Sequence, residues 1–225
     1  MPERIPPPTC VDEPGVRGFL HVPAVDPVAT LAVTHGAGGD CTAKVLTDLA
    51  ETWSAHGVVV LRFDMAFRQA KPSGPPHPSK AAADRESVRS AVDYLRSRGP
   101  APMLVGGHSY GGRQASMAAA ADPDLAAGLV LLSYPLHPQG KPEKLRTAHL
   151  PEITMPVLFV SGTRDPFGTP AELCDAIDLI PAKTVFIDIP GAAHDLSAAK
   201  HRTAHRALDG AAALFRFEPG ERAST

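Results

Sequence analysis

A serine on a glycine-rich turn is the first residue whose surroundings indicate chemistry. The sequence Gly107-His108-Ser109-Tyr110-Gly111 follows a short apolar segment and precedes a run of small residues typical of a helix. Where Gly-x-Ser-x-Gly joins a strand to a helix, the turn is strained and the serine hydroxyl is exposed. Backbone N–H groups at the start of that helix favour negative charge. We therefore predict that Ser109 is a nucleophile for chemistry at a carbonyl group.

A serine nucleophile needs a base, and the base needs a carboxylate that orients it. The chain has 10 histidines, so position along the sequence must select among them. Asp165 and His194 each follow a predicted strand by a few residues, which places them at the same sheet edge as Ser109. Asp195 is a rival acid, but adjacent loop residues seldom reach that geometry. The alternatives are a helix cap or turn residue for Asp165 and a surface histidine for His194.

Glycines also follow an earlier strand, in the sequence His35-Gly36-Ala37-Gly38-Gly39. Backbone N–H groups in such a loop can turn inward and stabilise a developing oxyanion, together with the N–H that follows the nucleophile. We predict Ala37 and Tyr110 as the oxyanion-hole donors, with Gly38 as the alternative to Ala37. An ordinary glycine-rich turn without this role is the competing interpretation.

Apolar strands and amphipathic helices alternate along the chain and must position these residues. Uninterrupted apolar strands separated by helices indicate a mostly parallel sheet with helices on both faces. Ligands bind beyond the carboxyl ends of such strands, where the residues above lie. We expect a hairpin at 9–12 and 16–22, strands at 30–34, 58–63, 103–107, 129–133, 157–161 and 184–189, helices at 43–56, 80–97, 114–121, 170–180 and 198–215, and a loop at 66–78.

These motifs together resemble the α/β-hydrolase superfamily, whose catalytic residues follow one another as Ser, Asp and His. The resemblance covers about residues 16–215. It implies an α/β-hydrolase fold with a mostly parallel central sheet of about seven to eight strands and helices on both faces. Segments 61–64, 111–113, 133–138 and 162–168 further resemble small bacterial dienelactone-hydrolase-like proteins. They are also similar to the hydrolase-like domain of the third subunit of the animal non-specific-lethal complex.

One residue departs from the pattern of the dienelactone hydrolases. Those enzymes use a cysteine nucleophile where this chain has Ser109, so the resemblance does not imply lactone chemistry. The animal relative is also a scaffold component, which keeps a non-catalytic interpretation open.

The segment at 134–156 follows the strand after the serine turn and contains five prolines. It is too short for a multi-helix cap, so we expect a minimal cap or none and an open site for small acyl or ester substrates. Arg68, Tyr134 and His137 are the candidate pocket residues, and a loop position without a role is the alternative for each. Arg113 is expected to make structural contacts.

Length and composition narrow the remaining possibilities. The 225 residues fit one domain, 1–225, with a loose lead-in at 1–8 and a loose tail at 218–225. A net charge of −2 argues against a nucleic-acid partner, and no apolar run approaches the length of a membrane span. The N-terminus has no apolar stretch typical of a secretory signal. The three cysteines then indicate reduced thiols and a cytoplasmic protein.

No metal and no cofactor are expected. His201 and His205 are four residues apart on a predicted helix, as metal ligands can be, but no third ligand is indicated. Cys41 lies near the predicted oxyanion loop and is expected to be an inert thiol.

The leading hypothesis is a serine hydrolase that cleaves a carboxylic ester, or a related small-molecule acyl substrate, through an acyl-enzyme on Ser109. The same residues would also serve an acyltransferase or a perhydrolase. A binding or scaffold protein on a hydrolase fold is the non-enzymatic alternative. A monomer and a dimer are both compatible with the sequence.

Overall fold

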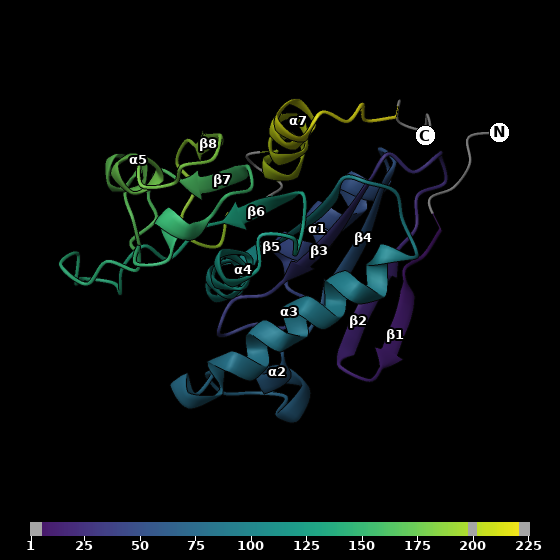
Figure 1. Cartoon of the computed structure of the whole chain (residues 1–225), viewed down its shortest axis with the longest axis horizontal. Coiled ribbons are helices and arrows are strands. Elements are labelled where there is room, and N and C mark those ends of the chain that lie inside the picture. The colour runs from purple at the N-terminus through teal and green to yellow at the C-terminus, as the bar shows by residue number, and fades with distance from the viewer. Residues whose placement is uncertain (1–5, 198–201, 221–225) are drawn as a thin grey trace.

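A computed structural model describes residues 6–197 and 202–220. Parts of the predicted lead-in and tail, the start of the predicted helix at 198–215 and His201 therefore lie outside the described residues. The central feature is an eight-stranded sheet in the order β1-β2-β4-β3-β5-β6-β7-β8 (Figure 1). The strands are β1 (Thr9–Glu13), β2 (Val16–His21), β3 (Ala29–Thr34), β4 (Val58–Phe63), β5 (Met103–His108), β6 (Gly128–Leu132), β7 (Val157–Gly162) and β8 (Thr184–Ile189).

The pairing of the strands confirms a mostly parallel sheet. From β4 to β8 every neighbouring pair is parallel, whereas the β1–β2 hairpin joins β4 through an antiparallel pair. Every residue of β3, β4, β6 and β7 is buried. Strands buried on both faces need no polar alternation, which is why their sequences are mostly apolar.

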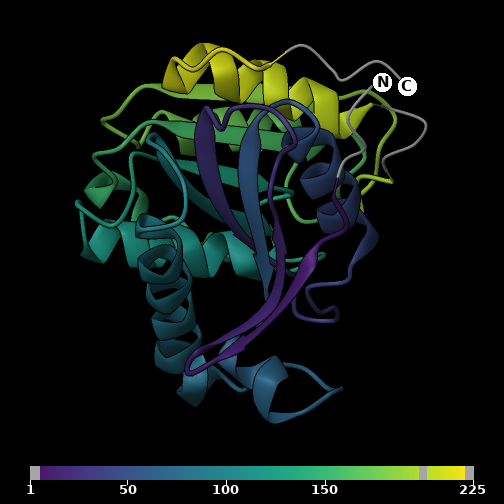
Figure 2. The ribbon, with the colours of Figure 1, turned by 90° about the vertical axis from the view of Figure 1, so that its right-hand side faces the viewer.

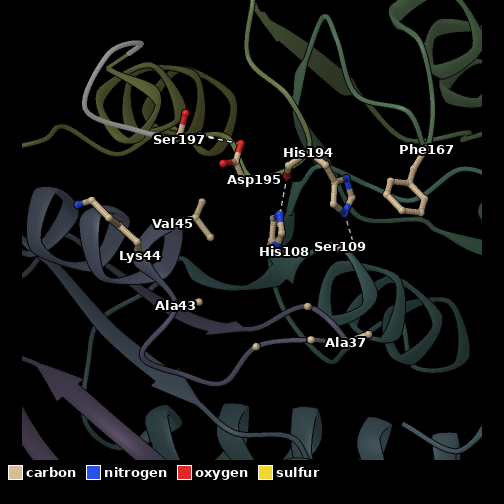
Figure 3. Close-up of a pocket in the computed structure, with 13 residues that line it drawn as sticks. Ala37, Ala43, Lys44, Val45, His108, Ser109, Phe167, His194, Asp195 and Ser197 are labelled. Atoms are coloured by element: carbon tan, nitrogen blue, oxygen red, sulfur yellow. Dashed lines mark hydrogen bonds between the residues drawn. The ribbon is translucent and has the colours of Figure 1, made fainter. Parts of the chain in front are cut away.

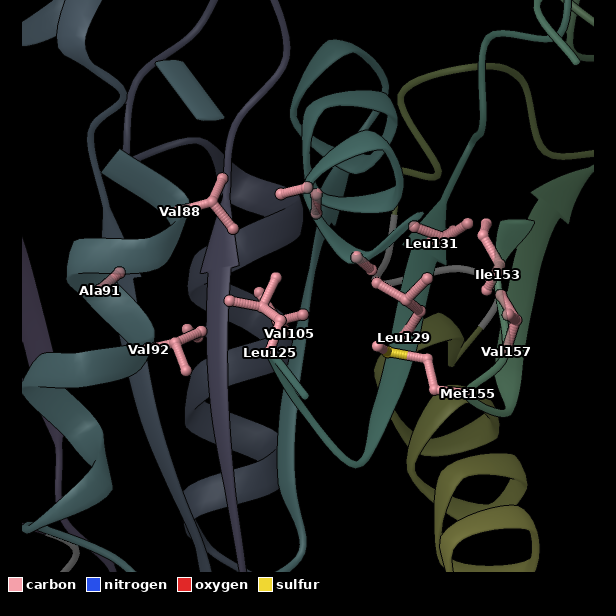
Figure 4. Packing of buried hydrophobic residues seen from close by; sticks show 14 of the residues in the cluster. Val88, Ala91, Val92, Val105, Leu125, Leu129, Leu131, Ile153, Met155 and Val157 are labelled. Atoms are coloured by element: carbon pink, nitrogen blue, oxygen red, sulfur yellow. The ribbon is translucent and has the colours of Figure 1, made fainter. Parts of the chain in front are cut away.

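Helices cover both faces of this sheet, as Figures 1 and 2 show. On one face α1 and α7 lie together, and the Trp53 indole N–H of α1 donates to the Ala204 carbonyl of α7 at 3.0 Å. On the other face α3 and α4 pack side by side, with valines of α3 beside Val105 of β5 (Figure 4). The helices are α1 (Lys44–Ser54), α2 (Ala66–Ala70), α3 (Ala81–Arg96), α4 (Tyr110–Ala121), α5 (Pro170–Ile177) and α7 (Thr203–Phe215).

Two sequence predictions need correction. The segment at 66–78, predicted as a loop, contains helix α2. Tertiary contacts stabilise this short helix, because the Phe67 N–H donates to the buried carboxylate of Asp84 at 3.0 Å. Helix α4 begins at Tyr110, earlier than the predicted 114–121, because the helix starts directly after the serine turn.

The segment at 134–156 forms no separate cap. It contains a single 3-10 turn, Leu150–Glu152, and its first part folds back on itself. The Tyr134 hydroxyl donates to the Arg146 carbonyl at 2.7 Å, and the Arg146 N–H donates to the Leu136 carbonyl at 2.7 Å. In the part of the chain that the structure describes, no helix has both the length and the apolarity to cross a bilayer.

Candidate active site

Ser109 is the single residue that connects β5, which ends at His108, to α4, which begins at Tyr110. Its backbone has a φ of +51°, a conformation that is strained for a residue with a side chain. A Cβ at Gly107 would lie 2.7 Å from the Gly111 backbone carbon of α4, so β5 and α4 pass too closely for a residue with a side chain. The local sequence thus imposes a sharp turn with the serine at its apex.

Ser109, His194 and Asp165 form a continuous chain of hydrogen bonds. Ser109 Oγ lies 2.8 Å from His194 Nε2, and His194 Nδ1 lies 2.8 Å from Asp165 Oδ2. Figure 3 shows the His194 ring between the end of β5 and the loop that carries Phe167. With its proton on Nδ1, facing the carboxylate, the imidazole leaves Nε2 as an acceptor for the Ser109 hydroxyl proton.

The Asp165 carboxylate is held by donors other than His194. It is buried, and the Phe167 N–H donates to Oδ1 at 2.9 Å while the Ser161 hydroxyl donates to Oδ2 at 3.4 Å. The Phe167 ring centroid also lies 4.3 Å from that of His194. These contacts fix both the acid and one face of the imidazole.

His108 is a residue of the site that the sequence analysis missed. Its Nε2 lies 2.8 Å from the His194 carbonyl oxygen (Figure 3), and burial lowers the pKa of His108 to about 4. The ring is therefore neutral at neutral pH, with Nε2–H as the donor to that carbonyl. The only signal in the sequence was its place beside the nucleophile, which does not reveal a bond to a loop 86 residues away.

The oxyanion-hole candidates lie on the loop after β3 and at the start of α4. The Gly36 carbonyl accepts from His35 Nδ1 at 2.8 Å and from the Gly39 N–H at 3.2 Å. In a trans peptide the N–H points away from its carbonyl, so the Ala37 N–H is turned away from these partners. Within the described residues the N–H groups of Ala37, Gly38 and Tyr110 have no acceptor.

Arg68 does not line the cavity beside Ser109, contrary to the sequence prediction. Its guanidinium, on α2, is buried and donates to the carbonyls of Gly39 at 2.8 Å, Ala37 at 3.3 Å and Gly74 at 3.2 Å. These carbonyls, two of them from the glycine loop (36–39), occupy the guanidinium N–H groups that a substrate would need. Arg68 therefore stabilises the glycine loop through hydrogen bonds to its carbonyl groups.

Tyr134 and His137 do not line that cavity either. Tyr134 is 1% exposed and donates to the Arg146 carbonyl, while the His137 imidazole Nδ1 lies 2.9 Å from the Pro138 carbonyl oxygen. Tyr134 holds the folded-back segment together, and His137 is buried with its Nε2 3.5 Å from the Glu172 carboxylate.

Cys41 is buried, and its thiol is protonated at neutral pH. Burial, followed by the charge of Asp64, raises the pKa of Cys41 to about 12. Its N–H donates to Asp64 Oδ1 at 2.7 Å, so the residue anchors the end of the glycine loop. In the described ranges, no three His, Cys, Asp or Glu side chains gather where they could hold a metal ion.

A cavity of about 660 Å³ opens beside the Ser109 hydroxyl. One wall consists of the glycine loop from Gly36 to Gly39, and apolar side chains of Ala43, Val45 and Phe167 extend it (Figure 3). Lys44 and Asp195 contribute one charge of each sign. The volume suits a small organic molecule.

The strand order, the serine turn and the hydrogen-bonded Ser-His-Asp set agree with a family match. Residues 27–215 match the family described as "Alpha/beta hydrolase domain". The chain belongs to the α/β-hydrolase family. This assignment agrees with the fold expected from the sequence motifs.

Solved structures similar to this α/β-hydrolase show the same fold. A dienelactone hydrolase from Anabaena variabilis has 20% identity and a TM-score of 0.71, and the match covers 96% of this chain and 100% of that one. Est1E from Butyrivibrio proteoclasticus has 18% identity and a TM-score of 0.72, with 93% and 99% covered. An α/β serine hydrolase without a lid from Xanthomonas campestris has 18% identity and a TM-score of 0.62, with 91% and 90% covered.

Proposed function

We propose that this α/β-hydrolase is a serine hydrolase that cleaves small carboxylic esters through an acyl-enzyme on Ser109. The observation that carries the proposal is the unbroken hydrogen-bond chain from Ser109 through His194 to Asp165, at the mouth of a cavity of substrate size. Membership of the family supports hydrolase activity. The complete set of three residues argues against a scaffold, which has no physical need for it.

In the first half of the proposed reaction, Ser109 Oγ attacks the ester carbonyl and His194 Nε2 takes the hydroxyl proton. The imidazolium that forms is stabilised by the buried Asp165 carboxylate, which also keeps Nδ1 protonated. The C–O bond of the tetrahedral intermediate then breaks as His194 returns the proton to the leaving alcohol. Ser109 remains as an ester of the acyl group.

In the second half, water takes the place of the alcohol. His194 removes a proton from the water, which attacks the acyl carbon, and the same proton passes to Ser109 Oγ as the acid leaves. The N–H groups of Ala37 and Tyr110, with Gly38 as the alternative to Ala37, are proposed to stabilise the oxyanion in both halves. Each such donor typically contributes about 2.7–4 kcal/mol to transition-state stability.

The cavity favours small acyl groups with apolar surface. Val45, Ala43 and Phe167 offer apolar contacts close to the nucleophile, and the 134–156 segment forms no cap over the site. The relative from Xanthomonas campestris is described as a serine hydrolase without a lid, which supports an open site here. An acyltransferase or perhydrolase would use the same residues and differ in the acceptor that replaces water.

A panel of p-nitrophenyl esters of increasing acyl length tests the proposal. We expect hydrolysis of short acyl esters, and loss of hydrolysis by at least about 10⁴-fold in Ser109→Ala. Ser197→Ala is the matched control, because Ser197 lines the same cavity without joining the hydrogen-bond chain. Equal activity of the two variants would overturn the assignment of the nucleophile. Activity that appears only with an added alcohol or peroxide acceptor would instead favour acyl transfer.

A further inference from the structure

A second cavity, lined in part by Tyr110, is separate from the cavity beside Ser109. It has a volume of about 300 Å³ and is formed by the first turns of α3 and α4 and the loop that carries Pro76 and Pro78. Helices α3 and α4 are neighbours on one face of the sheet (Figure 1). The two cavities have no lining residue in common.

Two side chains that line this cavity each have a buried nitrogen without a hydrogen-bond acceptor. Gln114 is 1% exposed, and its amide Nε2 has no partner. Its Oε1 accepts from Arg85 Nη1 at 3.1 Å, while its N–H₂ group is buried and unpaired. The Nε of Arg113 is also buried without a partner. Buried donors left unpaired are rare because they are destabilising.

The charges in the cavity all have the same sign. Arg85 and Arg113 line it, and no acidic residue does. Neither guanidinium has an ion pair among the described residues. The nearby Asp84 carboxylate is already engaged, because it accepts from the Phe67 N–H at 3.0 Å and the Tyr110 hydroxyl at 2.8 Å.

The positive charge of Arg113, on α4, also acts on His149 and Arg146. The charge of Arg113, after the larger effect of burial, contributes to the lowered pKa of His149, about 4, and to the lowered pKa of Arg146. No carboxylate is among the groups that shift these two pKa values. Guanidinium forks favour planar or tetrahedral oxyanions, which accept two parallel hydrogen bonds.

We propose that this cavity is a binding site for a small oxyanion, a carboxylate or a phosphate group, held by the guanidinium groups of Arg85 and Arg113. The site is independent of the chemistry at Ser109 and does not require the hydrolase proposal to hold. Tyr110, the residue after Ser109, is one of the residues that line the cavity.

Isothermal titration calorimetry with inorganic phosphate and with succinate, at an ionic strength held constant with sodium chloride, tests the proposal. We expect one anion per chain, with affinity reduced about tenfold or more in Arg113→Gln and in Arg85→Gln. Arg89→Gln removes the same charge from the same helix outside the cavity and should bind as the unchanged protein does. Ser109→Ala should also bind normally. Preference for phosphate or for succinate identifies which oxyanion the site takes.

Two outcomes would overturn the site. One is the absence of heat above dilution for both anions in the unchanged protein. The other is an Arg85→Gln variant that binds as tightly as Arg89→Gln. Arg85 is partly exposed on α3, so its replacement keeps the test decisive if Arg113→Gln, next to the serine turn, fails to fold.

Discussion

His194 is held at three points, which leaves its imidazole one orientation toward Ser109. Asp165 binds Nδ1, the Phe167 ring packs on the imidazole, and His108 binds the His194 carbonyl. A base fixed in this way needs little reorganisation when it accepts a proton. In the proposed mechanism the Asp165 carboxylate also selects the tautomer of His194.

Replacing Asp165 and Asp195 one at a time tests which of the two carboxylates orients His194. Asp165→Asn should reduce kcat by about 10⁴-fold, since the amide favours the wrong tautomer of His194. Asp195→Asn should change kcat little, because the Asp195 carboxylate accepts from the Ser197 N–H and not from His194. Steady-state ester hydrolysis measures both. If Asp195→Asn were the more damaging, the acid would be misassigned.

Among single residues, the sequence correctly placed those whose position in the fold is set by an adjacent strand. Ser109, Asp165 and His194 are each anchored to the end of a recognisable strand, so their convergence followed from the order of the strands. Arg68 was misplaced because its partners are backbone carbonyls of a loop 29 and 31 residues away. Residue type alone does not distinguish a buried support from a substrate ligand.

The serine turn is the element on which the site depends most. At Gly107 an added Cβ would lie 2.7 Å from the Gly111 backbone carbon, and neither the strand nor the helix can yield without moving Ser109. Close contacts of this kind in a well-packed interior usually destabilise a protein.

A pair of alanine substitutions tests this requirement. Gly107→Ala should lower the free energy of unfolding by about 1–3 kcal/mol or more and abolish ester hydrolysis. Gly38→Ala is the control, because nothing lies within 4 Å of the added Cβ, and its unfolding should match that of the unchanged protein. Urea denaturation measures both. A Gly107→Ala protein of normal stability would show that the turn tolerates a side chain.

The glycine loop depends on helix α2, the element that the sequence did not reveal. Five residues are too few for a periodic apolar pattern, so only the tertiary partners of Phe67 and Arg68 account for this helix. The buried parallel strands, by contrast, are mostly apolar, and their positions were predicted closely.

Removal of the Arg68 guanidinium should loosen the glycine loop and weaken the proposed oxyanion hole. We expect Arg68→Ala to reduce kcat by about 10–100-fold with a smaller change in KM, because the loss falls on the transition state. Low concentrations of guanidinium chloride should restore part of the kcat in this variant alone. A change in KM without a change in kcat would instead indicate a substrate contact.

On the scale of the whole molecule, burial of neutral histidines predicts how stability varies with pH. The pKa values of His21, His108 and His149 are lowered to about 4, mainly by burial. Above the unfolded value of 6.5 these rings are neutral in both states and stability does not depend on them. Below it the unfolded chain gains protons that the folded chain excludes, so stability falls as pH decreases from 6.5 toward 4.

Urea denaturation between about pH 7.5 and pH 5 should show this decrease, on the order of 1 kcal/mol per histidine after solvent screening. His149→Gln should make the decrease shallower. His77→Gln should leave it unchanged, because His77 is exposed. A free energy of unfolding that is constant over this range would contradict the burial of these rings as neutral groups.

The most direct measurement of the central claim is covalent labelling by a fluorophosphonate probe at neutral pH. This reagent phosphonylates a serine only where a base and an oxyanion hole activate it. We predict rapid labelling of the unchanged protein, located by mass spectrometry at Ser109, and no labelling of Ser109→Ala or of the heat-denatured chain. A folded protein that remains unlabelled, or that is labelled at another serine, would contradict the account of Ser109 as an activated nucleophile.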